Sequence, residues 1–410
     1  MQSPFKDLPR EISILVAASF FVAVGFGIVL PAIPVFAQTF GVNNAAIGLV
    51  ISMFAITRFA SGLISGKLVD LFGERVVFST GVFMVALFVL LAGLSTTYTQ
   101  LLLFRAAGGL GSSMFSVAAG SVIMRAVDDE HRGRAQAVYN GAFLFGGISG
   151  PAIGGVLSLI SLRAPFFAYS ALLLVSGVIA HFFLRGEKIG KRDKNSDESE
   201  HTTVREALAM KPYRTALLLV FIGNWVIFGM RTSIMPIFVI ETLQSTTAVV
   251  GYGFAISAIF QGALLMQGGR ISDSKGRRYA SILGSSILLV GLILLTVTVH
   301  PWMFLLSMAI MGVGGAYLST TPASIVGDII RGRGGQVIAV FQMAGDAGMI
   351  VGPLVLGALS DMYSFRTAFA VSALVFAFGV FLTTTIPETR QNHISGKSEK
   401  PQINNLRPLD

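Results

Sequence analysis

The chain contains no cysteine, which excludes disulfide bonds, thiolate metal sites and cysteine nucleophiles. Charged side chains are also scarce, at 12% of the 410 residues, whereas 53% of the residues are hydrophobic and the mean hydropathy is +0.73. An ordinary soluble domain carries about 25% charged residues. The composition therefore excludes a soluble globular protein and places the chain in a lipid bilayer.

The sequence also lacks the patterns of cofactor and nucleotide sites. Its five histidines have no metal-ligand spacing, and no glycine-rich loop ends in Lys-Ser or Lys-Thr, as a nucleotide-phosphate loop does. The glycine-rich stretch GGLGSS lies in an apolar run and not between a strand and a helix, which argues against a dinucleotide site. We therefore expect no cofactor, no bound metal, no enzymatic reaction and no use of ATP.

What fills the sequence is a succession of apolar runs. About 20 apolar residues are needed to cross a hydrocarbon core about 30 Å thick. Twelve runs are long enough, namely residues 12–37, 45–65, 76–96, 99–125, 135–160, 165–185, 213–240, 247–268, 279–299, 302–327, 336–360 and 364–386. They are continuously apolar, whereas the strands of a membrane barrel alternate. The sequence predicts twelve transmembrane helices, the first of them a retained span and not a signal peptide.

Positive charge is distributed one-sidedly along the chain. Of the 30 Lys and Arg residues, 25 fall in the two termini and the even-numbered loops, two in the odd-numbered loops and three inside the runs. Cytoplasmic loops retain positive charge, so we expect both termini on the cytoplasmic side of a plasma or cell inner membrane. With this distribution, the net charge of +9 favours contact with anionic lipid headgroups and not with nucleic acid.

A polar segment at residues 186–212 divides the runs into six and six, and the two halves repeat. At an offset of 202 or 203 residues, the coinciding pairs are Gly27 and Gly229, Pro34 and Pro236, Gly66 and Gly269, Asp70 and Asp273, Gly73 and Gly276, Arg75 and Arg278, Gly150 and Gly352, and Pro151 and Pro353. An even number of helices gives both halves the same orientation, as in transporters whose two bundles rock about a central site.

The repeat defines the predicted domains. They are an N-terminal six-helix bundle at 1–185, a cytoplasmic linker at 186–212, a C-terminal six-helix bundle at 213–390 and a disordered cytoplasmic tail at 391–410.

Three motifs resemble those of the major facilitator superfamily. GKLVDLFGER resembles the family's signature loop between the second and third spans, and FRAAGGLG resembles its fourth-span motif through Arg105 and Gly108. GGISGPAIGG resembles the glycine-proline motif of the fifth span, which is characteristic of the family's exporters. The resemblance covers residues 1–390 and implies the major facilitator fold, with similarity to the drug:proton antiporters.

The signature loop and its second copy are candidates for conformational gating. Glycine permits a tight turn and a close approach of helices. The resemblance implies that Asp70 faces the start of the eleventh span at Gly334, whose free N–H groups carry partial positive charge, and favours the state closed to the cytoplasm. A local turn stabilised by Asp70 and Arg75 is the alternative. The candidate gating residues are Gly66, Asp70, Gly73, Arg75, Gly269, Asp273, Gly276 and Arg278.

The fifth-span motif is a candidate hinge and interface. Its glycines at every fourth position leave one side of a helix bare, so another backbone can pack closely. Pro151 removes an intrahelical hydrogen bond and allows a bend. The alternative is simple helix packing, and the second copy departs from the pattern at Leu356, so we expect it to be structural only. The residues concerned are Gly146, Gly150, Pro151, Gly154, Gly155, Gly352 and Pro353.

Four ionisable residues lie inside predicted spans, where a charge is rare without a role: Arg58, Arg105, Arg231 and Asp346. Asp346 lies roughly 15 Å from the start of the eleventh span and Arg58 roughly 12 Å from the cytoplasmic end of the second. The resemblance places these two spans together, so we expect an ion pair between Arg58 and Asp346. An arginine favours the ionised carboxylate and burial favours the neutral one, so alternate exposure would load and unload a proton. A static pair is the alternative.

Arg105 and Arg231 lie in the outer thirds of the fourth and seventh spans, which line the family's cavity. The resemblance assigns the fourth-span arginine to proton transfer, but arginine does not release its proton, so we expect Arg105 to tune a neighbouring group. Two converging arginines would alternatively suit an anionic substrate. Phe26, Asn224 and Trp225 are further cavity candidates, although aromatic residues on spans often face lipid or pack in the core.

These observations predict a monomeric, proton-coupled exporter of small amphipathic, drug-like compounds. The first alternative is a transporter of an anionic or sugar-like metabolite on the same fold, for which Arg105 and Arg231 would be essential. The second is a non-transporting membrane sensor or scaffold, against which the paired loop motifs and the buried Asp346 argue. The fold alone does not decide the substrate.

Overall fold

The computed structural model describes residues 9–127, 129–184, 202–318, 321–329 and 335–385, and within these ranges every regular element is a helix. The N-terminal half contains α1 (Arg10–Val29), α2 (Ala32–Gln38), α3 (Asn44–Ala60), α4 (Gly62–Phe72), α5 (Glu74–Leu94), α6 (Tyr98–Ala126), α7 (Asp129–Ile160) and α8 (Ala164–Phe183). The C-terminal half contains α9 (Val204–Ala209), α10 (Lys211–Asn224), the π-helix η1 (Trp225–Ile234), α11 (Met235–Glu241), α12 (Thr247–Lys275), α13 (Arg277–Thr296), α14 (Pro301–Leu318), α15 (Thr321–Ile329), α16 (Gly335–Met362) and α17 (Phe365–Thr384).

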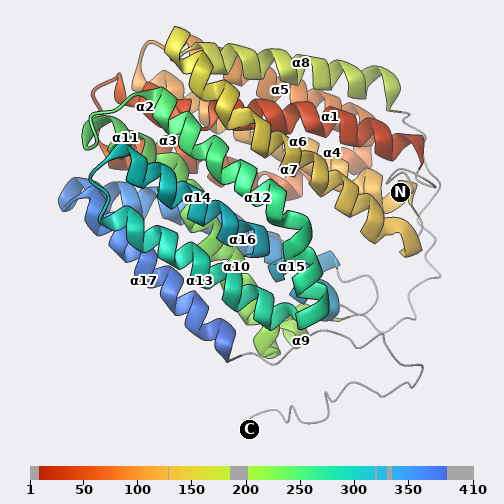
Figure 1. The fold of residues 1–410 in the computed structure, drawn as a ribbon. Coiled ribbons are helices and arrows are strands. Elements are labelled where there is room, and N and C mark those ends of the chain that lie inside the picture. The colour runs from red at the N-terminus through yellow and green to blue at the C-terminus, as the bar shows by residue number, and fades with distance from the viewer. Residues whose placement is uncertain (1–8, 128, 185–201, 319–320, 330–334, 386–410) are drawn as a thin grey trace.

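These helices form the twelve predicted spans in order. Ten helical segments of the described residues are long and apolar enough to cross a membrane, and the pair α3 and α4, bent by 49°, makes an eleventh. The 32-residue helix α7 supplies the twelfth, since its length of roughly 48 Å exceeds a bilayer core. Figure 1 shows the first-half helices, red to yellow, side by side above the green and blue helices of the second half.

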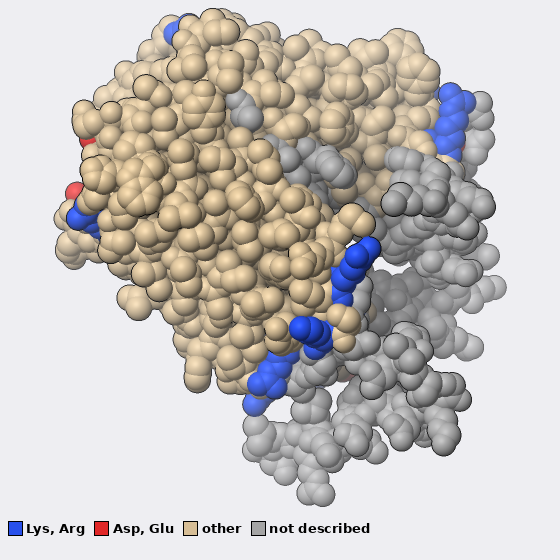
Figure 2. All heavy atoms as spheres, in the orientation of Figure 1, with Lys and Arg blue, Asp and Glu red and all other residues tan. Residues whose placement is uncertain are grey.

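Each half has its own apolar core. One cluster joins α1, α3, α5, α6 and α8 and takes in Ile237 of α11 from the second half, and another joins η1, α12, α13, α14 and α17. The middle of the visible face is also free of charge: in Figure 2, the Lys, Arg, Asp and Glu side chains of the described residues lie toward the ends of that face and leave a broad uncharged band between them. A bilayer would surround that band.

The two ends of the bundle differ. The terminus end carries the start of α1, helix α9 and the end of α17, and the short-loop end carries the brief connections after α2, α5, α7, α11, α13 and α16. Even numbers of spans in each half bring the chain back to the terminus end, as the sequence predicts.

The internal repeat is visible in matching contacts. A Cβ added to Gly27 of α1 would lie 3.0 Å from the Gly150 Cα of α7, and one added to Gly229 of η1 would lie 2.6 Å from the backbone of Gly352 of α16. Likewise, Arg75 Nε donates to the carbonyl of His181 at 2.7 Å, and Arg278 donates to the carbonyl of Thr384, each 106 residues further on. Both arginines thereby tie the start of one helix to the end of the last helix in its half.

Among the described helices, the two most extensive contacts between the halves are those of α3 with α16 and of α7 with α12. At both, backbones meet without intervening side chains: an added Cβ on Gly48 would lie 2.2 Å from the Pro353 carbonyl oxygen, and one on Gly155 would lie 2.8 Å from the Gly251 Cα. The halves therefore pack in close backbone contact along these pairs.

Polar contacts reinforce this closure at the short-loop end. The Asp361 carboxylate accepts hydrogen bonds from the backbone N–H groups of Asn44, at 2.9 Å, and Ala45, at 2.8 Å, at the start of α3. The Gln38 amide donates to the Glu241 carboxylate, and these two residues are 203 positions apart and so occupy matching places in the repeat. Toward the terminus end, α4 leaves the direction of α3 by 49° and packs on α5 and α6 of its own half.

Candidate functional site

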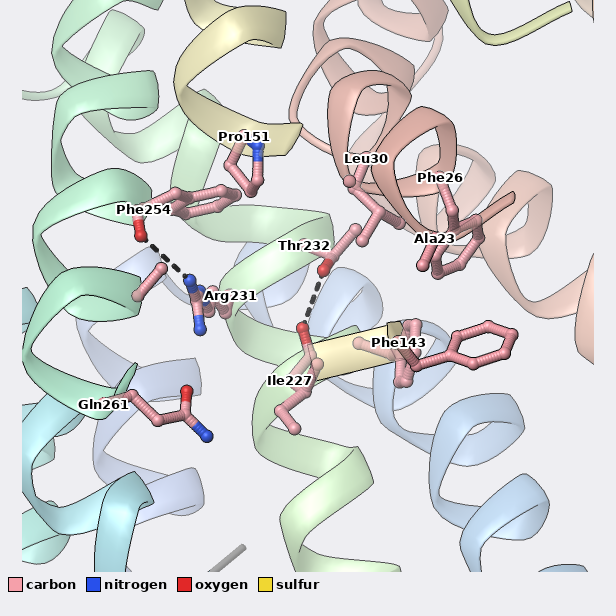
Figure 3. Close-up of a pocket in the computed structure, with 13 residues that line it drawn as sticks. Ala23, Phe26, Leu30, Phe143, Pro151, Ile227, Arg231, Thr232, Phe254 and Gln261 are labelled. Carbon is pink, nitrogen blue, oxygen red and sulfur yellow. Dashed lines mark hydrogen bonds between the residues drawn. The ribbon is translucent and has the colours of Figure 1, made fainter. Parts of the chain in front are cut away.

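A cavity of about 240 Å³ lies between the two halves. Its walls come from α1, α7, η1 and α12, so each half supplies two of the four helices. Figure 3 shows Phe26, Leu30 and Pro151 of the first half opposite Arg231 and Phe254 of the second. Arg231, Thr232 and Gln261 are the polar lining residues among those described, and the remaining lining residues are Ala23, Phe26, Gly27, Leu30, Phe143, Pro151, Ile227, Phe228, Phe254 and Ala258.

The π-helix η1 presents Arg231 to this cavity. Its wider turn is visible in two bonds between residues five apart, the Met235 N–H to the Met230 carbonyl and the Thr232 hydroxyl to the Ile227 carbonyl at 2.8 Å. Pro236 comes directly after and has no N–H to donate, so the regular i to i−4 pattern is interrupted there. Such π segments occur frequently at functional sites.

The Arg231 guanidinium has little to bind within the protein. It donates one long hydrogen bond, 3.4 Å, to the Phe254 carbonyl, and its central carbon lies 4.8 Å from the centre of the Phe254 ring. No carboxylate of the described residues lies within ion-pair distance of it. Figure 3 shows the hydrogen bond from Arg231 to the Phe254 carbonyl, with Gln261 of α12, the helix of Phe254, nearby. Arg231 is thus a positive charge on the cavity wall, held by an aromatic face and one carbonyl.

Arg105 lies one layer behind the cavity. Its side chain on α6 is 4% exposed, its guanidinium carbon stands 4.5 Å from the centre of the Phe54 ring, and its Nε has no hydrogen-bond partner. The Phe54 ring stacks at 6.3 Å on Phe26, which does line the cavity. The structure therefore corrects the expectation that Arg105 is a cavity residue, because two phenylalanine rings separate it from the open space.

Two other predicted cavity residues also point elsewhere. The Trp225 side chain is 6% exposed and donates from Nε1 to the Ser372 hydroxyl at 3.1 Å, so it belongs to the core of the second half. The Asn224 amide packs on Gly345 of α16, where an added Cβ would lie 2.7 Å from Nδ2. Of the five cavity residues expected from the sequence, Phe26 and Arg231 line the cavity.

The Arg58 and Asp346 side chains meet across the interface between the halves. Arg58 Nη2 of α3 lies 3.5 Å from Asp346 Oδ1 of α16, and the two side chains are 34% and 19% exposed. Two turns away along α3, the Ser52 hydroxyl donates to the Ile350 carbonyl at 2.7 Å. The ion pair expected from the sequence is therefore present, outside the set of residues that line the cavity.

The repeat shows how unequal the two interfaces are. The residue 203 positions after Arg58 is Gln261, on the second interface, where it lines the cavity, and the residue 202 positions before Asp346 is Leu144. The ion pair thus belongs to the α3–α16 interface and has no counterpart in the sequence at the α7–α12 interface. This comparison would have identified Gln261 as a site residue before the structure was known.

The structure gives different outcomes for the candidate gating residues. Gly73 and Gly276 have φ angles of 83° and 104°, a backbone conformation that favours glycine, and so form the expected tight turns. Gly66 and Gly269 do not mediate a close helix approach here, since an added Cβ would meet nothing within 4 Å. Asp70 lies exposed on the last turn of α4. Its expected partner Gly334, and the side chain of Asp273, lie outside the part of the chain that the structure describes.

The glycines of α7 form the expected bare stripe. Cβ atoms added to Gly146, Gly150 and Gly154 would lie 2.5, 2.6 and 2.0 Å from atoms of α1. Pro151, on the same helix, lines the cavity. The stripe therefore fixes α7 against α1 while Gly155, beside it, contacts α12 of the other half.

Comparisons with known proteins agree with this architecture. The sequence profile of the Major Facilitator Superfamily matches residues 15–243 and 217–408. An uncharacterized MFS-type transporter of Methanocaldococcus jannaschii is 25% identical over 90% of this chain and 98% of its own. Multidrug resistance protein 1 of Bacillus subtilis is 25% identical over 91% and 95%. A bacterial homolog of the human lysosomal transporter Spinster, solved inward-facing and unoccupied, superimposes with a TM-score of 0.76 at 18% identity over 94% and 99%.

Proposed function

This chain belongs to the major facilitator superfamily, and from that premise we propose that it exports small amphipathic compounds in exchange for protons. It is a multi-pass membrane transporter and not an enzyme. Among its relatives, the name of the Bacillus subtilis protein states multidrug resistance. For this chain we infer from that name the export of a broad range of compounds.

The observation that carries the proposal is a mostly apolar cavity between the halves together with one ion pair across their interface. An apolar wall with few polar groups suits compounds that are themselves mostly apolar. Rocking of the halves would expose the cavity alternately at the two ends. Because the halves pack tightly at the short-loop end, a compound would enter this conformation from the terminus end.

The coupling step is assigned to Arg58 and Asp346. Their contact joins α3 to α16 and therefore exists only while these two helices are adjacent at that level. A proton that binds the Asp346 carboxylate removes its charge and releases Arg58, which weakens the interface. When Asp346 next meets Arg58, the ion pair favours loss of that proton on the opposite side. One proton would cross per cycle.

Orientation and gating complete the proposal. In this proposal the terminus end, which carries most of the positive charge, faces the cytoplasm across a plasma or cell inner membrane. Residues 1–185 and 213–390 are the two rocking units, 186–212 their linker and 391–410 a tail. The signature loops, with Asp70 and Arg75 in the first copy, would close the terminus end in the other conformation.

The proposal is tested by proton movement in proteoliposomes. Purified protein is reconstituted with a pH-sensitive dye inside, and a panel of cationic, neutral and anionic amphipathic compounds is added to wild type and to Asp346→Asn. We expect compound-triggered proton flux in wild type and its loss in Asp346→Asn. Glu206→Gln, the same carboxylate-to-amide change on the exposed helix α9, is the matched control. Compound movement without proton flux, equal in both proteins, would refute the coupling.

A further inference from the structure

The charges around the cavity are unbalanced. Arg231 lines it, and no Asp or Glu is among the lining residues that the structure describes. The Asp346 carboxylate at the interface between the halves is already paired with Arg58 at 3.5 Å. A guanidinium has five N–H donors, and Arg231 uses one of them in a 3.4 Å bond to a carbonyl. The cavity wall therefore offers a cation with unused donors.

A second cation adds to the positive field. Arg105 is 4% exposed, has an unpartnered Nε, and stacks on Phe54 with no carboxylate of the described residues within ion-pair distance. An isolated charge in an apolar setting is costly unless something pairs with it. Each of the two arginines lies against a phenylalanine ring, and no carboxylate of the described residues lies within ion-pair distance of either. An anion in the cavity would pair with Arg231, and Arg105, behind the rings of Phe54 and Phe26, would add to the positive potential there.

The remaining polar groups define how such an anion would be held. The Thr232 hydroxyl already donates to the Ile227 carbonyl at 2.8 Å, so its proton is committed. The Gln261 amide lines the same wall and makes no hydrogen bond within the described part of the chain, which leaves its N–H₂ group able to donate. The rings of Phe26 and Phe228 also line the cavity, and both pack against the apolar cluster of Phe54. The site thus has a cationic, donor-rich wall and an aromatic wall.

We propose that the exported compound is an amphipathic monoanion, such as an aromatic carboxylate or sulfonate. Its charged oxygens pair with the Arg231 guanidinium and the Gln261 amide, and its apolar body lies against Phe26, Phe228 and Phe254. This assignment rests on the proposed function, since it names the substrate class of the same cavity. Arginine suits it because its planar fork binds the two oxygens of a carboxylate together.

Charge movement distinguishes this substrate class from a cationic drug. Exchange of one proton for one monocation moves no net charge, whereas exchange of an inward proton for an outward monoanion moves two positive charges inward. A membrane potential that is negative inside therefore accelerates export of an anion and leaves one-for-one export of a cation unchanged.

Binding is tested first, with three compounds that share one body. Equilibrium dialysis of purified protein with labelled 1-naphthoate, 1-naphthalenemethanol and 1-naphthylmethylammonium compares anion, neutral compound and cation. We expect wild type to bind 1-naphthoate most tightly, Arg231→Gln to bind it about ten- to hundred-fold more weakly, and Arg231→Lys to recover part of the loss. The matched control is Arg163→Gln, which removes an arginine whose guanidinium carbon lies 5.8 Å from the Phe36 ring, outside the cavity. Melting temperatures identify variants that fail to fold.

Transport then separates this inference from the proposed function. In proteoliposomes with a potential set by potassium and valinomycin, we expect 1-naphthoate flux to follow the potential. Preferred binding of the naphthylmethylammonium cation, or 1-naphthoate affinity unchanged in Arg231→Gln, would overturn the anion assignment while proton-coupled export of another class could still hold. Arg231-dependent 1-naphthoate binding without any proton flux would support the anion site and refute proton coupling.

Discussion

Asp361→Asn should open the short-loop end of the transporter. The Asp361 carboxylate of α16 accepts two hydrogen bonds, at 2.9 and 2.8 Å, from the N–H groups of Asn44 and Ala45, which are the exposed donors at the start of α3. It also places a negative charge at the positive end of that helix. Since α3 and α16 belong to different halves, both effects favour the conformation closed at this end.

The size of the effect depends on the interactions that asparagine retains. Its amide oxygen accepts one of the two hydrogen bonds, its N–H₂ group faces the second donor, and its charge is zero. One charge-assisted hydrogen bond and one charge–dipole contact are lost at an exposed site, which we place at about 1–2 kcal/mol. The ratio of closed to open molecules should therefore fall roughly 5- to 30-fold.

Spin-label distances measure this ratio directly. The chain has no cysteine, so Ser161→Cys and Thr242→Cys supply the only two labels, one on each half at the short-loop end. By pulsed electron spin resonance, we expect a larger population of long distances in Asp361→Asn than in the parent protein. The matched control Glu206→Gln should show no such increase. If the ratio of short to long distances changes less than twofold in Asp361→Asn, Asp361 does not hold the halves together.

Three further predictions concern stability, each measured as thermal unfolding of purified protein. Arg58→Gln and Asp346→Asn should each destabilise by about 1–2 kcal/mol by leaving a partly exposed charge unpaired, and the double variant should lose less than their sum by about 1 kcal/mol; strict additivity would contradict a pair that contributes energy. Gly48→Ala should cost about 1–3 kcal/mol because its Cβ would stand 2.2 Å from a carbonyl oxygen of α16, whereas Gly120→Ala, with nothing within 4 Å, should cost nothing; equal melting temperatures would show that the interface yields. Gly73→Ala should cost about 1–2 kcal/mol because its φ is 83°, and an unchanged melting temperature would mean that the turn rearranges.

Much of the fold can be predicted from sequence because bilayer constraints are strong. Each apolar run has to satisfy its own backbone hydrogen bonds and therefore forms a helix, and the repeat fixes how the halves are oriented. The Arg58 and Asp346 pair could be predicted because the family resemblance places their two helices together and because two charges at matching depth in an apolar setting favour each other. The positive φ at Gly73 and Gly276 likewise reflects local chemistry.

Side-chain direction was not predictable in the same way. Trp225 and Asn224 were expected in the cavity, but a continuously apolar run has no polar face that shows which side points inward, and the partners of both side chains lie on distant helices, Ser372 of α17 and Gly345 of α16. The π-helix that begins at Trp225 packs closely at Gly229 against Gly352, which lies far away in the sequence, and the apolar pattern does not predict this contact. The same long-range packing places Arg105 behind Phe54 and Phe26.

Uphill accumulation of a compound in response to an imposed pH gradient tests the central claim most directly. Proteoliposomes are given opposite pH gradients, and labelled compound inside is measured over time in wild type and Asp346→Asn. We expect wild type to concentrate the compound on the acidic side beyond equilibrium, a protonophore to abolish this accumulation, and Asp346→Asn only to equilibrate the compound. Accumulation in Asp346→Asn equal to that of wild type, or equilibration alone in wild type, would contradict proton-driven export.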